Sequence, residues 1–184
     1  MKLNKSIFFF MIPVLVLFAA CNGKKEKATT GNDSIAVMPD STLVHGKHCL
    51  QESKSEINIT FKDKTYHSVV ARTPDESLTN VKDEDGKPFL DNKIDVQLTC
   101  GDRTVFHKVF TKSDFSSMVD SSFYARSILE ALVFEKTVPQ GFVFVASISY
   151  PQTDSFIPFT ITVDVHGKVS IAKRDMLDDD EVEQ

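Results

Sequence analysis

The stretch Lys93–Thr111, KIDVQLTCGDRTVFHKVFT, decides the fold class. Apolar and polar residues alternate on both sides of Gly101-Asp102, which is the pattern of two half-buried strands joined by a tight turn. Glycine supplies the positive backbone angle that such a turn needs. The stretch therefore predicts a β-hairpin.

Strand patterns continue on both sides of this hairpin. Apolar residues alternate with polar ones in Ile57–Phe61, and Thr65–Arg72 follows after a short turn. Phe142–Tyr150 is almost continuously apolar, as in a strand that is covered on both faces. Phe156–Val165 alternates again, and Lys168–Ala172 follows a His-Gly turn. The sequence therefore predicts a domain dominated by strands.

One segment has helical spacing instead. Its apolar residues recur every three or four positions, at Ala125, Ile128, Leu129, Leu132 and Val133. Asp120 or Ser121 could cap its start, and Pro139 prevents its continuation. The combined prediction is an α+β domain: an antiparallel sheet of about seven strands with one main helix packed on one face.

The N-terminal residues have the three parts of a secretory signal peptide. Lys2 and Lys5 precede fourteen apolar residues, Ile7–Ala20. A membrane-spanning helix needs roughly 20 apolar residues, so this run is short for a permanent anchor. The positive start, the short apolar core and the small residues at its end together predict an exported protein; an uncleaved anchor is the alternative.

The segment Phe18-Ala19-Ala20-Cys21 resembles the bacterial lipobox, in which the cysteine is acylated and the chain is cut immediately before it. Phe18 stands where that motif usually has leucine. The resemblance implies lipid attachment at Cys21, with palmitate among the acyl chains, and a membrane partner through that anchor. Acidic residues usually follow the cysteine in lipoproteins sent to the cell surface, whereas Lys24 and Lys25 stand here. This favours an outer-membrane location facing the periplasm.

The domain boundaries follow from composition. Residues 1–20 are the predicted signal peptide, and residues 21–43 are the lipidated cysteine and a polar tether. Residues 44–174 are predicted to form a single domain, and residues 175–184 an acidic disordered tail. Of the 26 acidic residues, six lie in the last ten positions, so the body between Asn22 and Arg174 is nearly neutral. A nearly neutral body argues against a nucleic-acid partner.

Two further cysteines, Cys49 and Cys100, follow Cys21. An even pair in an oxidising compartment predicts a disulfide. Cys100 continues the apolar face of Ile94, Val96 and Leu98, so a buried free thiol is the alternative.

One cluster has metal-ligating side chains: His45, His48 and Cys49, with His67 or His107 as a possible fourth ligand. The chain has no second paired-ligand motif, and Gly46 argues against a helix that would align the side chains. Ordinary surface histidines beside a disulfide-bridged cysteine are the favoured interpretation. We therefore predict no metal site and no cofactor.

The sequence does not match the other common motifs of catalysis and ion binding. A calcium loop has glycine at its sixth position and carboxylates at its first and twelfth. If Gly86 of Asp83-Glu84-Asp85-Gly86 were the sixth residue, Val81 would be the first and Asn92 the twelfth. Neither is a carboxylate, so we interpret the segment as an acidic turn. The chain lacks a Gly-x-Ser-x-Gly elbow and a glycine-rich phosphate loop. Tryptophan is absent, and most phenylalanines fall at core-facing positions, which argues against glycan binding. No catalytic residue is predicted.

The whole layout resembles small Bacteroidetes lipoproteins of a domain-of-unknown-function family, domain of unknown function 4738. The resemblance rests on the lipobox, the Asp85-Gly86 loop, the acidic tail, and the segments Ile57–Lys64 and Phe156–Ile171. It implies no activity and no site residues. From the sequence we expect a cell-envelope lipoprotein, a non-enzymatic module that binds a protein, peptide or small envelope ligand. The alternative is a periplasmic hydrolase whose site assembles from distant residues.

Overall fold

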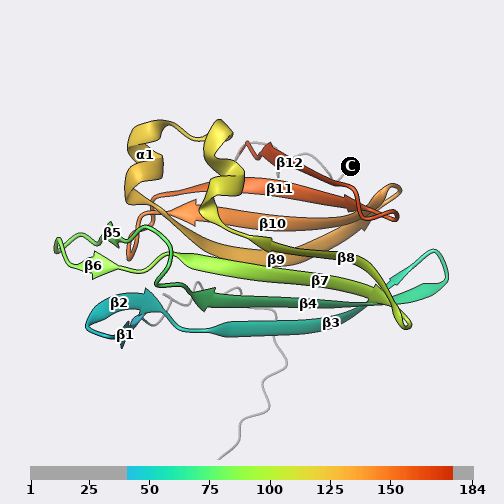
Figure 1. The fold of residues 1–184 in the computed structure, drawn as a ribbon. Helices are drawn as coiled ribbons and strands as arrows, with labels where there is room; N and C mark the ends of the chain where they lie inside the picture. The colour runs from blue at the N-terminus through green and yellow to red at the C-terminus, as the bar shows by residue number, and fades with distance from the viewer. Residues whose placement is uncertain (1–40, 176–184) are drawn as a thin grey trace, which may run out of the picture. The chain divides into compact units, whose positions relative to one another are not determined.

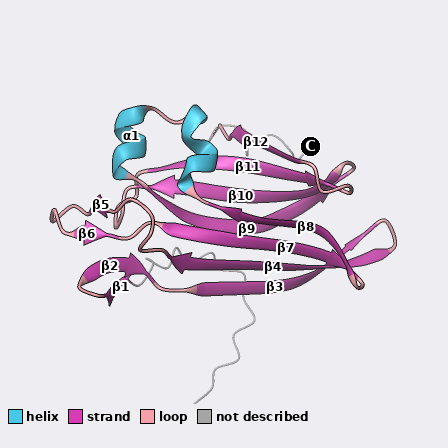
Figure 2. Ribbon diagram, viewed as in Figure 1, coloured by secondary structure: helices cyan, strands magenta, loops and turns pink. Residues whose placement is uncertain are grey.

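The computed structural model describes residues 41–175. These residues form twelve strands and two short helices (Figures 1 and 2). The elements are β1 (Ser41–Val44), β2 (Lys47–Leu50), β3 (Ser53–Phe61), β4 (Lys64–Pro74), β5 (Val81–Lys82), β6 (Pro88–Phe89), β7 (Asn92–Cys100), β8 (Arg103–Phe110), the 3₁₀ helix η1 (Lys112–Met118), α1 (Ser121–Arg126), β9 (Ile128–Val138), β10 (Gly141–Ser149), β11 (Phe156–Asp164) and β12 (Val169–Lys173).

Two four-stranded antiparallel sheets share one hydrophobic core. One has the order β3-β4-β7-β8 and the other β12-β11-β10-β9. Alternate side chains of both sheets belong to the same buried cluster, as expected for two sheets packed face to face. The ring of Phe142 on β10 lies 4.7 Å from that of Tyr66 on β4, measured between centroids. Packing of aromatic rings across the two sheets therefore joins them.

The helices close one end of this core. η1 places Phe115 fully inside, with its ring centroid 4.8 Å from that of Phe159 on β11. Asp120 caps α1, because its carboxylate accepts a hydrogen bond of 2.9 Å from the Phe123 amide. The two helices carry the chain from β8 in one sheet to β9 in the other (Figure 1).

A third, smaller sheet has the order β1-β2-β6-β5. β2 and β6 pair in parallel, and the other two pairings are antiparallel. Its β1 begins at Ser41, so the last three residues of the predicted tether belong to a strand. Leu50, Val81 and Phe89 of this sheet form a small apolar cluster with Ile128 of β9.

The predicted fold class is wrong. Residues 41–175 form three four-stranded sheets rather than one α+β sheet of about seven strands. The predicted main helix is also wrong, because α1 ends at Arg126 and residues 128–138 form β9. By contrast, the hairpin predicted around Gly101-Asp102 is confirmed, with Cys100 paired to Arg103 and Gly101 at a φ of 57°.

Two β-bulges explain the error in β9. The register with β10 skips Glu130 and Glu135, so each adds one residue to β9 that has no partner. Leu129, Leu132 and Phe134 then all face the core, opposite Ile148, Ala146 and Phe144. The first two inward residues are three positions apart instead of two. That spacing imitates one turn of a helix.

Side chains of the other sheet bind the main chain at the first bulge. Arg72 of β4 donates a hydrogen bond of 2.6 Å to the Glu130 carbonyl, and the Asn92 amide donates one of 2.9 Å to the Leu129 carbonyl. The start of β9 is therefore held by β4 and β7. No helix within residues 41–175 is long and apolar enough to cross a membrane.

Candidate functional site

The residues of the predicted metal cluster do not come together. His45 lies on the β1–β2 turn, where its Nδ1 is 2.5 Å from the Glu76 carboxylate, whereas Cys49 is buried in β2. His67 bonds Asn58 on the neighbouring strand, and His107 bonds Asp95 over 2.9 Å. Within residues 41–175 no three His, Cys, Asp or Glu side chains gather as metal ligands would. Each histidine bond here is an ordinary surface contact.

The predicted Cys49–Cys100 disulfide is not formed in the structure. Both thiols are free. β2, which holds Cys49, pairs with β6 close to the start of β7, whereas Cys100 is the last residue of β7. The nine residues of β7 make eight steps of extended chain, a span of roughly 26 Å, and a bridge needs Cα atoms less than about 7 Å apart.

The predicted acidic turn is present. Gly86 has a φ of 77° and donates its amide to the Asp83 carbonyl over 3.0 Å. The Asp83 carboxylate accepts a hydrogen bond of 2.8 Å from the Lys87 amide. Lys87 in turn pairs with Asp85 at 3.0 Å. These contacts make the segment a compact β5–β6 turn, in which Asp83 Oδ1 and Asp85 make local bonds.

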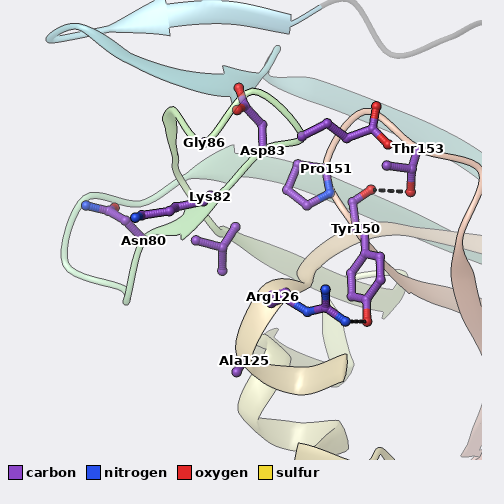
Figure 3. Close-up of a pocket in the computed structure, with 11 residues that line it drawn as sticks. Asn80, Lys82, Asp83, Gly86, Ala125, Arg126, Tyr150, Pro151 and Thr153 are labelled. Carbon is purple, nitrogen blue, oxygen red and sulfur yellow. Dashed lines mark hydrogen bonds between the residues drawn. The ribbon is translucent and has the colours of Figure 1, made fainter. Parts of the chain in front are cut away.

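A hollow lies beside this turn, and we call it the larger hollow to distinguish it from a smaller one described below. It has a volume of about 550 Å³ and is lined by three segments: the β5–β6 hairpin, the end of α1 and the β10–β11 turn. Its lining residues are Asn80, Val81, Lys82, Asp83, Glu84, Gly86, Ala125, Arg126, Tyr150, Pro151 and Thr153. Figure 3 shows Asn80 and Lys82 on one wall and Arg126 with Tyr150 on the other.

Arg126 is fixed against Tyr150. Its guanidinium donates a hydrogen bond of 2.7 Å to the Tyr150 hydroxyl and lies 4.6 Å from the centre of that ring. Phe123 stacks on the same ring at 4.4 Å. These contacts hold the positive charge of Arg126 at the wall of the hollow. Because the side chain is already fixed, it loses little conformational entropy when a ligand binds.

The larger hollow also holds polar groups that are free to bind a ligand. The side chains of Asn80, Lys82 and Glu84 are exposed and make no hydrogen bond or ion pair with any described residue. They offer an amide, an ammonium and a carboxylate. By contrast, the Asp83 carboxylate is turned away from Arg126 and Tyr150 (Figure 3). The lining contains no histidine, serine or cysteine among the described residues.

A second, smaller hollow of about 270 Å³ adjoins the first at Ala125. Asp91 and Lys112 line it together with Thr79 and Tyr124. The Asp91 carboxylate is 3.4 Å from the Lys112 ammonium, and both side chains are buried. Lys112 also donates to the Ser127 carbonyl and lies 4.7 Å from the centre of the Tyr124 ring.

The electrostatics of Asp91 follow from its burial. Desolvation raises the pKa of its carboxyl group, and the Lys112 charge together with two backbone amides opposes that rise. One oxygen, Oδ1, accepts both amides, from Asn92 and Leu129, over 2.8 Å each. The other, Oδ2, faces Lys112. Both oxygens of Asp91 are therefore committed to holding β9, η1 and β7 together.

Sequence reasoning missed both hollows. Lys82, Asp91 and Lys112 stand in segments without periodicity or motif. Arg126 lies in the segment predicted as a helix, where it is one of several charged residues. Only the ends of non-adjacent elements bring these four residues together. The predicted lipid site, Cys21, lies outside the described residues, as do the signal peptide and most of the acidic tail.

Comparison with protein families gives one match. Residues 33–171 match the family model described as "Domain of unknown function (DUF4738)", which confirms the family that the sequence resembles. No curated protein matches the sequence. The family description names no ligand and no reaction.

Proposed function

The chain belongs to the family described as Domain of unknown function (DUF4738), and from this premise we propose that it is a lipid-anchored binding protein of the bacterial cell envelope. Two features of the N-terminal sequence support the anchor. A short apolar run ends at Ala20, and the lipobox-like cysteine follows it directly. The lysines at positions 24 and 25 favour the periplasmic face of the outer membrane.

One observation carries the binding role: the 550 Å³ hollow whose exposed Asn80, Lys82 and Glu84 have no partner among the described residues. Ligand sites are typically concave, of some 300–1,000 Å³, with a few polar groups on a largely preformed wall. This hollow has that size, and Arg126 on its far wall is already held by Tyr150. It therefore suits a small polar ligand.

A hydrolase is the second candidate, and the buried carboxyl group of Asp91 is the observation in its favour. A raised pKa in a cleft is a common property of catalytic acids. However, Asp91 Oδ1 accepts two main-chain amides and Oδ2 faces Lys112. Because both oxygens of Asp91 already have partners, this carboxylate is better suited to stabilising the fold than to transferring a proton. We therefore favour the binding role.

Lipid labelling in a bacterial host tests the anchor. The wild-type chain and the variant Cys21→Ser are grown with radioactive palmitate, and the membranes are separated by density. We expect label and outer-membrane recovery for the wild type, and neither for Cys21→Ser. Cys100→Ser is the matched control and should keep the label.

Two results would contradict the anchor and its placement. If Cys21→Ser retained palmitate, acylation at Cys21 would be excluded. If a protease added to intact cells removed the wild-type protein, the domain would face the outside rather than the periplasm.

A further inference from the structure

The outer edge of β5 is a free strand edge. Within residues 41–175, β5 is the last strand of its sheet and pairs only with β6. Asp83 donates its amide to the Lys87 carbonyl over 3.0 Å, so these two residues are a hydrogen-bonded pair. In an antiparallel ladder bonded and non-bonded pairs alternate. The Lys82–Pro88 pair is therefore non-bonded, and the main-chain N–H and C=O of Lys82 point away from β6.

Proline at position 88 fits this alternation, because it has no N–H to donate. α1 contacts β5, and the end of α1 lines the larger hollow together with Asn80, Lys82 and Glu84. A main-chain donor and acceptor of Lys82 thus accompany the free side chains at this edge. Such an edge can accept an added strand.

The free groups at the hollow have both signs of charge. Lys82 carries a positive charge, Glu84 a negative one, and Asn80 a neutral amide. The Nε and Nη2 atoms of Arg126 bond the Ser122 carbonyl and Tyr150, and its Nη1 makes no hydrogen bond with a described residue. A ligand with one carboxylate and one ammonium group complements this set better than a ligand with a single sign of charge.

The hollow is poorly suited to a sugar. Sugars commonly bind against an open aromatic face, and among the described residues of its lining Tyr150 alone is aromatic. Phe123 stacks on the Tyr150 ring, and the Arg126 guanidinium lies over it at 4.6 Å. The ring is thereby covered by the protein's own side chains.

The smaller hollow lengthens the site. It is lined by Leu78 and Thr79, which directly precede the lining residues of the larger hollow, and the two share Ala125. Together they follow the segment 78–84 along its length. An extended chain of a few residues matches this arrangement better than a compact molecule.

We propose that the free edge of β5 binds a short peptide in an extended conformation, with the peptide carboxylate at Lys82 and its ammonium at Glu84. The peptide adds main-chain hydrogen bonds to Lys82, and the hollow takes up its side chains. This proposal rests on the binding role proposed above and names the ligand class for the same site.

The test is an NMR titration of residues 22–184, which lack the signal peptide and the lipidated cysteine, with tetra-alanine as the probe. We expect saturable shifts in the amide signals of residues 78–84 and 124–126. Tetra-alanine amide, which lacks the carboxylate, should bind about two- to fivefold more weakly, in line with a partly exposed ion pair.

Variants separate the Lys82 contact from general charge effects. Lys82→Gln should weaken tetra-alanine about two- to fivefold and leave binding of the amide unchanged. Lys64→Gln is the control, because Lys64 is also an exposed strand lysine but lies on β4. Both variants change surface positions, and their unshifted spectra elsewhere will show that the fold is intact.

N-acetylglucosamine, galacturonate and inorganic phosphate complete the panel. If one of these shifts residues 78–84 and tetra-alanine does not, the peptide proposal is overturned while the binding role stands. If no probe shifts them, the peptide proposal is overturned and the binding role loses its support as well. Equal binding of tetra-alanine by Lys82→Gln and the wild type would refute the carboxylate contact.

Discussion

The carboxylate of Asp91 lies 3.4 Å from the ammonium of Lys112, and both side chains are less than one-tenth exposed. Asp91 also accepts the main-chain amide of Leu129, the second residue of β9. Lys112 is the first residue of η1 and donates to the Ser127 carbonyl, just before β9. This ion pair therefore fixes where the chain enters the second sheet. It also forms the inner wall of the smaller hollow.

The first prediction concerns the loss of one partner of this pair. Lys112→Met should lower the free energy of unfolding at pH 7 by about 3–5 kcal/mol, because it leaves the Asp91 charge buried without compensation. In Asp91→Asn, Oδ1 can still accept its two amides, but the Lys112 charge is unpaired. The double variant should recover most of the loss. Urea unfolding of all four proteins gives the coupling energy.

The pH dependence of Lys112→Met follows from the sign of the Asp91 shift. Burial raises the pKa of Asp91 in the folded state, so ionisation of this group opposes folding as the pH rises through that pKa. The defect of Lys112→Met should shrink in acid, where a protonated Asp91 needs no counter-charge. Lys108→Met, at a more exposed pair with Asp114, is the control and should cost about 1 kcal/mol or less. A defect that is independent of pH would contradict the explanation.

The sequence predicts those strands in which alternation is undisturbed. The hairpin around Gly101-Asp102 and the strands β10 and β11 follow directly from their apolar patterns. β9 could not be recognised, because the bulges at Glu130 and Glu135 disturb its period of two. The two-residue strands β5 and β6 are too short to carry a period at all.

The candidate site could not be predicted from the sequence, for a related reason. Lys82 lies on β5, Arg126 on α1 and Tyr150 after β10, and only long-range packing brings these elements together. The spacing of these residues along the chain does not indicate that they meet in the fold. The acidic turn at Asp83–Gly86, by contrast, depends on local bonds and was predicted.

A second prediction distinguishes the bulged strand from a helix in residues 128–138. Leu132 is 4% exposed and Val133 is 53% exposed. Leu132→Asn should therefore lower the free energy of unfolding by about 3 kcal/mol, and Val133→Asn by about 0.5 kcal/mol or less. A helix with the spacing of Leu129, Leu132 and Val133 would bury both residues. Equal losses in the two variants, measured by urea unfolding, would contradict the strand.

A third prediction concerns stability in acid. Asp75 accepts hydrogen bonds from Ser77 and pairs with Lys93 at 3.2 Å, and the Ser77 bonds first, then Lys93, lower its pKa to about 2. A lowered pKa stabilises the fold above the ordinary value of 3.8, and this contribution is lost as the pH falls towards 2.

Asp75→Asn tests this contribution. It should cost about 1 kcal/mol at pH 7, once solvent screening is allowed for, and nothing measurable at pH 2. Asp102→Asn, at an exposed position of the β7–β8 turn, provides the matched control. A loss for Asp75→Asn that persisted undiminished at pH 2 would show that its cause is not the charge.

The last prediction concerns the two thiols. Cys49 is fully buried, and desolvation, followed by the nearby Glu52 charge, raises its pKa, so little reactive thiolate is present. Cys100 is only partly buried at the end of β7. In a chain of residues 22–184, which lacks Cys21, N-ethylmaleimide should label Cys100 within minutes at pH 7. Cys49 should react only when the protein opens. After unfolding without reductant, mass spectrometry should count two labels, and a count of zero in protein exported to an oxidising compartment would establish a bridge and contradict the separation of the two thiols along β7.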